Sequence, residues 1–177
     1  FGPTLTGMVA TVAVVATTRR HRPQGIPDVL ARVQTREHPL SLRDALVSAA
    51  GAVLVIGGGQ SGGREGPIVQ LASTLAAKVV RAVGIAPQHA RALVAAGGAA
   101  GVAASFNTPI AGAFFALEII IGNFAMETFA PVIAATVTGT VVGQFLLGDR
   151  IALHLPAFTV NSAWEFVFYT ILGASCG

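Results

Sequence analysis

The sequence has little charge and a single cysteine. Only 11% of its 177 residues are Asp, Glu, Lys or Arg, whereas a typical soluble domain has about 25%. So few charges exclude a disordered chain, a coiled coil and a nucleic-acid-binding module built on a basic face. The one cysteine, Cys176, has no second cysteine with which to form a disulfide inside this sequence.

Several motifs of soluble and catalytic proteins are also missing. The glycine-rich run at 57–63 lacks the Gly-Lys-Ser or Gly-Lys-Thr ending that a phosphate-binding loop needs. The sequence has no His-Glu-x-x-His or Gly-x-Ser-x-Gly pattern, and its 4 histidines show no metal-ligand spacing. No aromatic residue stands among the arginines at 19–43, as nucleic-acid binding would favour. We therefore expect no enzyme, no cofactor, no metal site and no nucleic-acid partner.

What the sequence does contain is a succession of uncharged stretches, at 45–63, 66–77, 92–117, 128–148 and 151–164. A helix needs about 20 apolar residues to cross a bilayer, so this succession predicts an all-α, polytopic membrane protein. The second stretch is short, and glycines and Pro109 interrupt the third. Lipid cannot hydrogen-bond to an irregular backbone, so broken or re-entrant helices have to line a protein-enclosed path, which predicts a transport pathway.

Positive residues mark two connections, one at 19–43 before the first of these stretches and one at 78–91 between the second and the third. The positive-inside tendency places both connections in the cytoplasm. We expect residues 1–177 to form a single transmembrane domain of a multi-pass cell-membrane protein, incomplete at both ends. The expected helices lie at 4–18, 27–33, 41–56, 66–83, 88–104, 109–121, 129–147 and 162–173, with residues 53–56 ending a helix rather than forming a strand.

Three of these helices start at a proline beside a glycine or a capping residue. The starts are Gly25-Ile26-Pro27, Gly63-Arg64-Glu65-Gly66-Pro67 and Asn107-Thr108-Pro109. Proline suits the first turn of a helix, where its missing N–H would have had no partner. The third is interpreted as an ordinary helix start, capped by Asn107 or Thr108. The unpaired N–H groups and partial positive charge of the other two would attract an anion in a protein-lined cavity.

Glu65 is the carboxylate on which the function depends. It lies among glycines at a helix start in an apolar part of the sequence, and a carboxylate inside the membrane indicates function by default. Ionised, it would occupy the place that an anion takes, and protonated it would lose its charge and swing away. Two alternatives remain open: Glu65 caps a water-exposed helix end, or it is the acid and base of a membrane-embedded enzyme together with a histidine. The neighbouring Arg64 either serves as a cation in the pathway or holds the loop.

Two longer motifs carry a resemblance to a known family. Residues 63–67 are followed by Val69-Gln70, and the motif Ala-Ala-Ser-Phe-Asn-Thr-Pro-Ile-Ala-Gly at 103–112 is followed by Phe115 and Glu118. With Gly25-Ile26-Pro27 upstream in the expected order, these motifs resemble the signature segments of the CLC family of chloride channels and proton-coupled chloride transporters.

The resemblance implies a homodimer in a lipid bilayer, each subunit holding an anion pathway built from two inverted-topology repeats, of which this sequence covers the first. It implies that Glu65 is the external gating glutamate and that Gly25-Ile26-Pro27 belongs to the inner anion-coordinating loop. Chloride would be the transported ion, with protons as a second partner in coupled members. The helices at 109–121 and 129–147 would form part of the dimer interface. The residues expected around the outer anion position are Gly63, Arg64, Gly66 and Pro67.

Two positions depart from the family pattern. Gln24 replaces the serine of the inner loop, so that either its amide contacts the anion or backbone N–H groups act alone. Ile119 stands where coupled exchangers carry an internal glutamate. Because isoleucine cannot relay a proton, either conduction is passive or water or another group delivers protons to Glu65. Glu118 is either such a relay or a buried carboxylate bonded to nearby backbone.

Overall fold

The computed structural model describes residues 2–17, 25–35, 40–148, 162 and 164–176. Every regular element in these ranges is a helix, which confirms the expected all-α class. All eight expected helices are present, with ends displaced by up to three residues, and residues 53–56 continue a helix. The elements are α1 (Gly2–Thr17), α2 (Ile26–Thr35), α3 (Leu42–Gly57), α4 (Glu65–Val83), α5 (Pro87–Phe106), α6 (Pro109–Phe115), the π-helix η1 (Ala116–Ile121), α7 (Met126–Leu147) and α8 (Glu165–Cys176).

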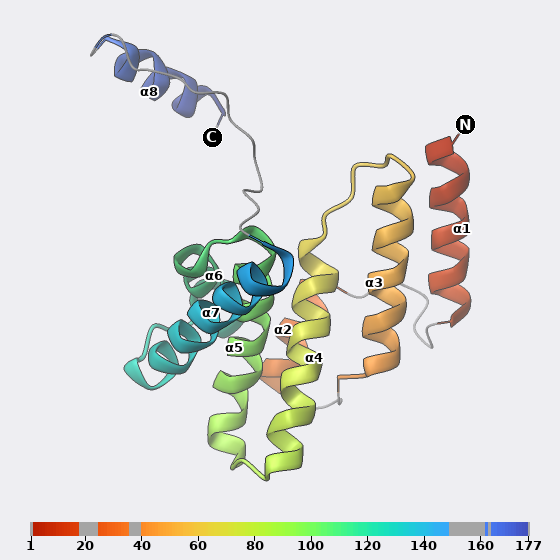
Figure 1. Cartoon of the computed structure of the whole chain (residues 1–177), viewed down its shortest axis with the longest axis vertical. Helices are drawn as coiled ribbons and strands as arrows, with labels where there is room; N and C mark the ends of the chain where they lie inside the picture. The colour runs from red at the N-terminus through yellow and green to blue at the C-terminus, as the bar shows by residue number, and fades with distance from the viewer. Residues whose placement is uncertain (1, 18–24, 36–39, 149–161, 163, 177) are drawn as a thin grey trace.

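Five helices follow one another across the molecule, each packed on the next, in the order α1, α3, α4, α5 and α7 (Figure 1). Helix α6 packs on α5 and α7, whereas α2 packs on α4, α5 and η1. Among the described elements, α8 contacts no other helix. In Figure 1 the α3–α4 connection leaves the upper end of α3 and descends to the start of α4, which lies part-way down the molecule. From there α4 runs to the α4–α5 connection at the lower end.

Small residues allow α5 to approach the helices on both of its sides. A Cβ placed on Gly101 would lie 2.7 Å from Cβ of Ala72 on α4. On the opposite side, a Cβ placed on Gly139 of α7 would lie 2.9 Å from the carbonyl oxygen and 3.0 Å from Cβ of Ala100. Close approach through small residues is a common way for membrane helices to associate, because lipid offers no hydrophobic drive between them. The glycines spaced four residues apart, at 97 and 101 on α5 and at 139 and 143 on α7, therefore allow these helices to pack closely.

The buried core lies where α4, α5, α7 and η1 meet. Val69, Leu117, Ile120 and Val132 are fully buried there. The outer faces are apolar as well: Phe145 of α7 is 88% exposed. Within the described ranges, one helix is long and apolar enough to cross a membrane, over Met126–Leu146, and only 17% of its most apolar window is buried. A continuous exposed apolar surface of this kind requires lipid or protein to cover it.

The turn between α5 and α6 corrects the expected capping. Asn107 ends α5 in the left-handed conformation, with φ 57°, and its backbone N–H donates to the carbonyl of Ala103. Thr108 occupies the N-cap position of α6 but makes no side-chain capping hydrogen bond. Asn107 instead accepts a 2.7 Å hydrogen bond at Oδ1 from Nε2 of Gln144 on α7. Its side chain thus ties the turn to a neighbouring helix, a long-range contact that local sequence rules do not encode.

The expected helix at 109–121 changes its winding halfway. Residues 109–115 are α-helical, and from Ala116 to Ile121 the turns widen into a π-helix that ends at Gly122, with φ 67°. Arg91 of α5 donates from Nη2 to the carbonyl oxygen of Ile121 at 3.3 Å. Such π-helical turns are rare and occur often at functional sites. Nothing in the spacing of apolar residues at 109–121 distinguishes this winding from a regular helix.

Candidate functional site

The starts of two helices meet at Gly66. A Cβ placed on Gly66 would lie 3.6 Å from Cα of Gly25 and 3.9 Å from the backbone nitrogen of Ile26. Gly66 belongs to the first turn of α4, and Gly25 accepts the first hydrogen bond of α2, from the N–H of Val29 at 3.3 Å. Two segments that lie 40 residues apart in the sequence are therefore in contact, as the predicted anion site requires. Glycine at position 66 leaves no side chain between them.

Both helix starts carry N–H groups without partners inside their own helices. The first hydrogen bond of α4 runs from the N–H of Ile68 to the carbonyl of Arg64, at 3.2 Å. The N–H groups of Glu65 and Gly66 precede this bond, and Pro67 has no N–H. Each helix start adds roughly half a positive charge. Two such starts close together add their positive potentials, which favours an anion as ligand.

Glu65 is the first residue of α4, and its side chain is exposed in this chain. The carboxylate folds back over the preceding loop, because a Cβ placed on Gly63 would collide with Oε2 of Glu65. A carboxylate in this position faces the partial positive charge of its own helix start.

Arg64 joins the two signature motifs. Its guanidinium carbon lies 4.5 Å from the ring centroid of Phe106, the last residue of α5. A cation over an aromatic face at this distance is attracted by the ring quadrupole, by about 0.5–1 kcal/mol at an exposed site. This contact favours the interpretation in which Arg64 holds the loop. Phe106 belongs to the second motif, yet sequence reasoning gave it no role, since only the fold shows which residue meets Arg64.

The remaining predicted residues lie apart from this meeting point or outside the described residues. Gln24 is outside them, so the contact expected of its amide stays a prediction. Pro27 follows Ile26 in the first turn of α2 and is exposed. Glu118 and Ile119 lie on the π-helix η1, which packs on α2 and α5. Glu118 is exposed in this chain, and both interpretations of Glu118 stay predictions.

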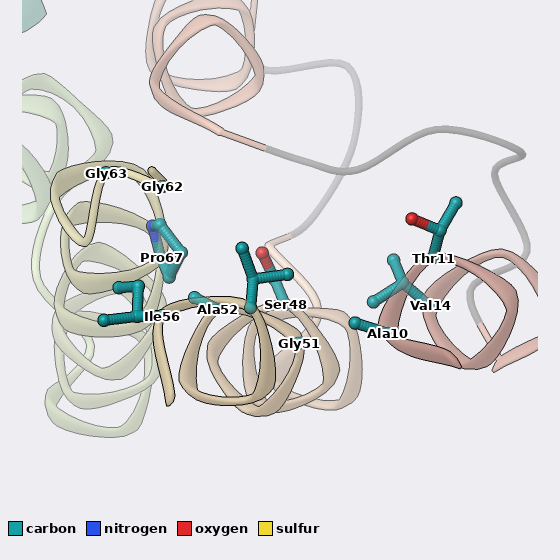
Figure 2. Close-up of a pocket in the computed structure, with 11 residues that line it drawn as sticks. Ala10, Thr11, Val14, Ser48, Gly51, Ala52, Ile56, Gly62, Gly63 and Pro67 are labelled. Carbon is teal, nitrogen blue, oxygen red and sulfur yellow. The ribbon is translucent and has the colours of Figure 1, made fainter. Parts of the chain in front are cut away.

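A pocket of about 260 Å³ lies beside the Glu65 loop, between α1 and α3. Figure 2 shows Thr11 and Val14 of α1 facing Ser48 of α3 across the space, with Pro67 of α4 at its other end. Sequence reasoning missed this pocket. The small residues at 48, 51 and 52 were a usable signal, because small residues spaced about one turn apart on a helix indicate close approach of a neighbour.

Comparison with known proteins agrees with the arrangement of these motifs. The family model described as "Voltage gated chloride channel" matches residues 6–177. The chain is 34% identical over 179 aligned residues to a ClcB-like chloride channel protein of Ralstonia nicotianae, covering 99% of this chain and 42% of that protein. It is 35% identical to the chloride channel protein CLC-e of Arabidopsis thaliana, over 77% of this chain and 20% of that protein.

A third relative is the voltage-gated ClC-type chloride channel ClcB of Yersinia pseudotuberculosis, which is 29% identical over 99% of this chain and 43% of its own length. The chain thus spans less than half the length of these relatives. The matches include both motif regions and the all-α architecture is the one the family requires. The chain belongs to the voltage gated chloride channel family and has its polytopic, all-α membrane fold.

Proposed function

We propose that the protein of which this chain is part transports chloride or another small anion across a membrane, with Glu65 as its gate. The observation that carries the proposal is the contact of Gly66 with Gly25 and Ile26, which brings the starts of α4 and α2 together. Membership of a family whose relatives are named chloride channels supports the same conclusion. Backbone N–H groups of the two starts would replace part of the hydration shell of the anion.

The gate works by competition. The ionised carboxylate of Glu65 is attracted to the N–H groups at the start of α4, as a chloride ion would be. Protonation removes this attraction, and the side chain can then leave the space over Gly63 to the anion. Arg64, held on Phe106 at 4.5 Å, keeps the loop in place while the carboxylate moves. Chloride flux should therefore depend on the protonation of Glu65.

Passive conduction is favoured over coupled exchange. Ile119, at the position matched to the internal glutamate, is apolar and 42% exposed, and it has no group that can take up a proton. Glu118 beside it is exposed and stays the candidate for a relay. Proton movement measured in the same vesicles separates the two modes, because uphill proton transport driven by a chloride gradient requires a relay.

The enzyme alternative has less support among the described residues. His89 is the histidine that these ranges contain, and it lies in the first turn of α5. Glu65 starts α4 and His89 follows its far end, so the length of a 19-residue helix, about 28 Å, lies between them. A general acid and base have to be within hydrogen-bond reach of the same reacting group.

A dimer is part of the proposal. The outer faces of α6 and α7 expose Ile110, Phe114 and Val141, and these helices are the ones expected at the dimer interface. We place the protein in the cell membrane with the α4–α5 connection in the cytoplasm. The positive residues Lys78, Arg81 and Arg91 near that connection support this orientation. The α3–α4 connection and the start of α4 then lie toward the outer side, where an external gate belongs.

The test is anion efflux from vesicles that contain the full-length protein, wild type or Glu65→Gln. Glutamine keeps the size of the side chain and cannot ionise, so the variant should conduct without the pH dependence of the wild type. Glu127→Gln is the matched control, since Glu127 is also an exposed carboxylate in the first turn of a helix, α7, away from the site. If Glu65→Gln leaves flux and its pH dependence like those of wild type, Glu65 is not the gate.

A further inference from the structure

The pocket beside Glu65 is built from three separate parts of the chain. Thr11 and Val14 come from α1, Ser48 and Ala52 from α3, and the third wall is the segment 62–67 around the start of α4 (Figure 2). Ser48 is 8% exposed, so the floor of the pocket is well covered. A void bordered by three segments that are distant in sequence is a feature of the fold, since no local turn or cap accounts for it.

The chemistry of the lining selects an uncharged ligand. None of its eleven residues carries a charge, and its side chains include two hydroxyls, of which that of Thr11 is on an exposed residue. No charged side chain lines the pocket, so its side chains would not replace the hydration of an ion. A molecule with an apolar body and one hydroxyl would lose little, because it can bury its carbon against Val14 and Pro67 and hydrogen-bond to a lining hydroxyl. Ligand pockets generally combine apolar walls with a few placed polar groups in this way.

The size of the pocket limits the ligand. An apolar cavity of about 150 Å³ accepts benzene, and drug-sized ligands occupy about 300–1,000 Å³. At about 260 Å³, the pocket lies between these limits. It therefore has room for a molecule somewhat larger than benzene, such as an eight-carbon alcohol.

We propose that this pocket binds small, uncharged, mostly apolar molecules with one hydroxyl, and that a bound molecule restrains the Glu65 gate. The second statement rests on the proposed function. Its structural basis is that Gly62, Gly63 and Pro67 line the pocket, while the carboxylate of Glu65 lies directly over Gly63. A molecule packed against these three residues fills space beside Gly63 into which the carboxylate of Glu65 could otherwise swing when it is protonated. Occupied, the pocket slows anion flux.

The first experiment measures binding without any transport. The full-length protein in vesicles is labelled with an octanol that carries a photoreactive diazirine, and the labelled residues are identified by mass spectrometry. Label should concentrate on the pocket segments of α1 and α3. Ala52→Leu adds three carbons inside the pocket and should reduce this label roughly tenfold, the scale of one excess group in an apolar pocket. Ala134→Leu, on an exposed position of α7, should leave it unchanged.

Thr11→Val is a second variant that keeps the volume of the pocket and removes one hydroxyl, so it should weaken the label even if Ala52→Leu fails to fold. Label spread evenly over lipid-facing helices, or label unaffected by both variants, overturns the site.

The second experiment measures anion efflux with unmodified octanol, relative to the basal flux of each variant. Octanol should slow the wild type and not Ala52→Leu. If the pocket is labelled but octanol does not slow anion efflux, a bound molecule does not restrain the gate. If the Glu65→Gln variant has the same flux and pH dependence as wild type, the proposed function is wrong, but the binding site is not.

Discussion

Replacing Gly139 by alanine should push α5 and α7 apart. The new Cβ would lie 2.9 Å from the carbonyl oxygen of Ala100, 3.0 Å from its Cβ and 3.2 Å from its Cα. Favourable contacts between carbon atoms lie at about 3.5–4.0 Å, so the helices have to separate by about half an ångström or more. The nearest atoms belong to the backbone and to Cβ of Ala100, and no rotamer change can move them.

Two opposing free energies set the size of the effect. Overpacking a closely packed site costs about 1–3 kcal/mol, while alanine is favoured over glycine inside a helix by about 0.5–1 kcal/mol. The difference spans about 0 to 2.5 kcal/mol, so the Gly139→Ala variant should lose about 1 kcal/mol of stability. For a domain of this size, each kcal/mol changes Tm by about 2–4 °C, so Tm should fall by a few degrees.

Thermal unfolding of the full-length protein in detergent, followed by far-ultraviolet circular dichroism, measures this change. Gly143→Ala is a control one turn further along α7, where the nearest atom, Cβ of Ala104, lies at 3.3 Å and little movement is needed. Gly173→Ala on α8 meets nothing within 4 Å and should raise or preserve Tm. Tm should be highest for Gly173→Ala, lower for Gly143→Ala and lowest for Gly139→Ala. A Gly139→Ala protein as stable as Gly143→Ala would refute the close approach of α5 and α7.

Two further substitutions test the gate and the π-helix. Gly63→Ala places a Cβ where Oε2 of Glu65 now lies. Because a flexible carboxylate can move aside, anion flux and its pH dependence should change while Tm does not. A fall in Tm with unchanged flux would contradict this position of the carboxylate. Arg91→Met removes the hydrogen bond from Arg91 to the carbonyl of Ile121, worth about 0.5–1.5 kcal/mol. It should lower Tm more than Arg81→Met, whose Nε bonds only to the carbonyl of Ala77 in its own helix, and equal losses would show that Arg91 does not hold the end of η1.

The sequence determined the secondary structure and the motifs of the candidate site. Uncharged stretches and proline-marked starts predicted each helix, because the length of an apolar run and the missing N–H of proline are local properties. Glycine at 63 and 66 likewise predicted a loop and a helix start around Glu65, and the structure has both. The glycine and carboxylate at 63 and 65 are two residues apart, so their steric relation depends only on the local backbone.

Only the tertiary structure decided what these local elements contact. The meeting of Gly66 with Gly25 and Ile26 depends on how α2 packs on α4, and the contact of Arg64 with Phe106 depends on the direction in which α5 returns along α4. The exposure of Glu118 and the wide turns of η1 were likewise visible only in the structure. The pocket at Ser48 lies between α1, α3 and the segment 62–67, which come from three separate parts of the chain. The burial of a residue and the close approach of two helices depend on neighbours from distant parts of the chain. Residue spacing in the sequence does not say which neighbours these are.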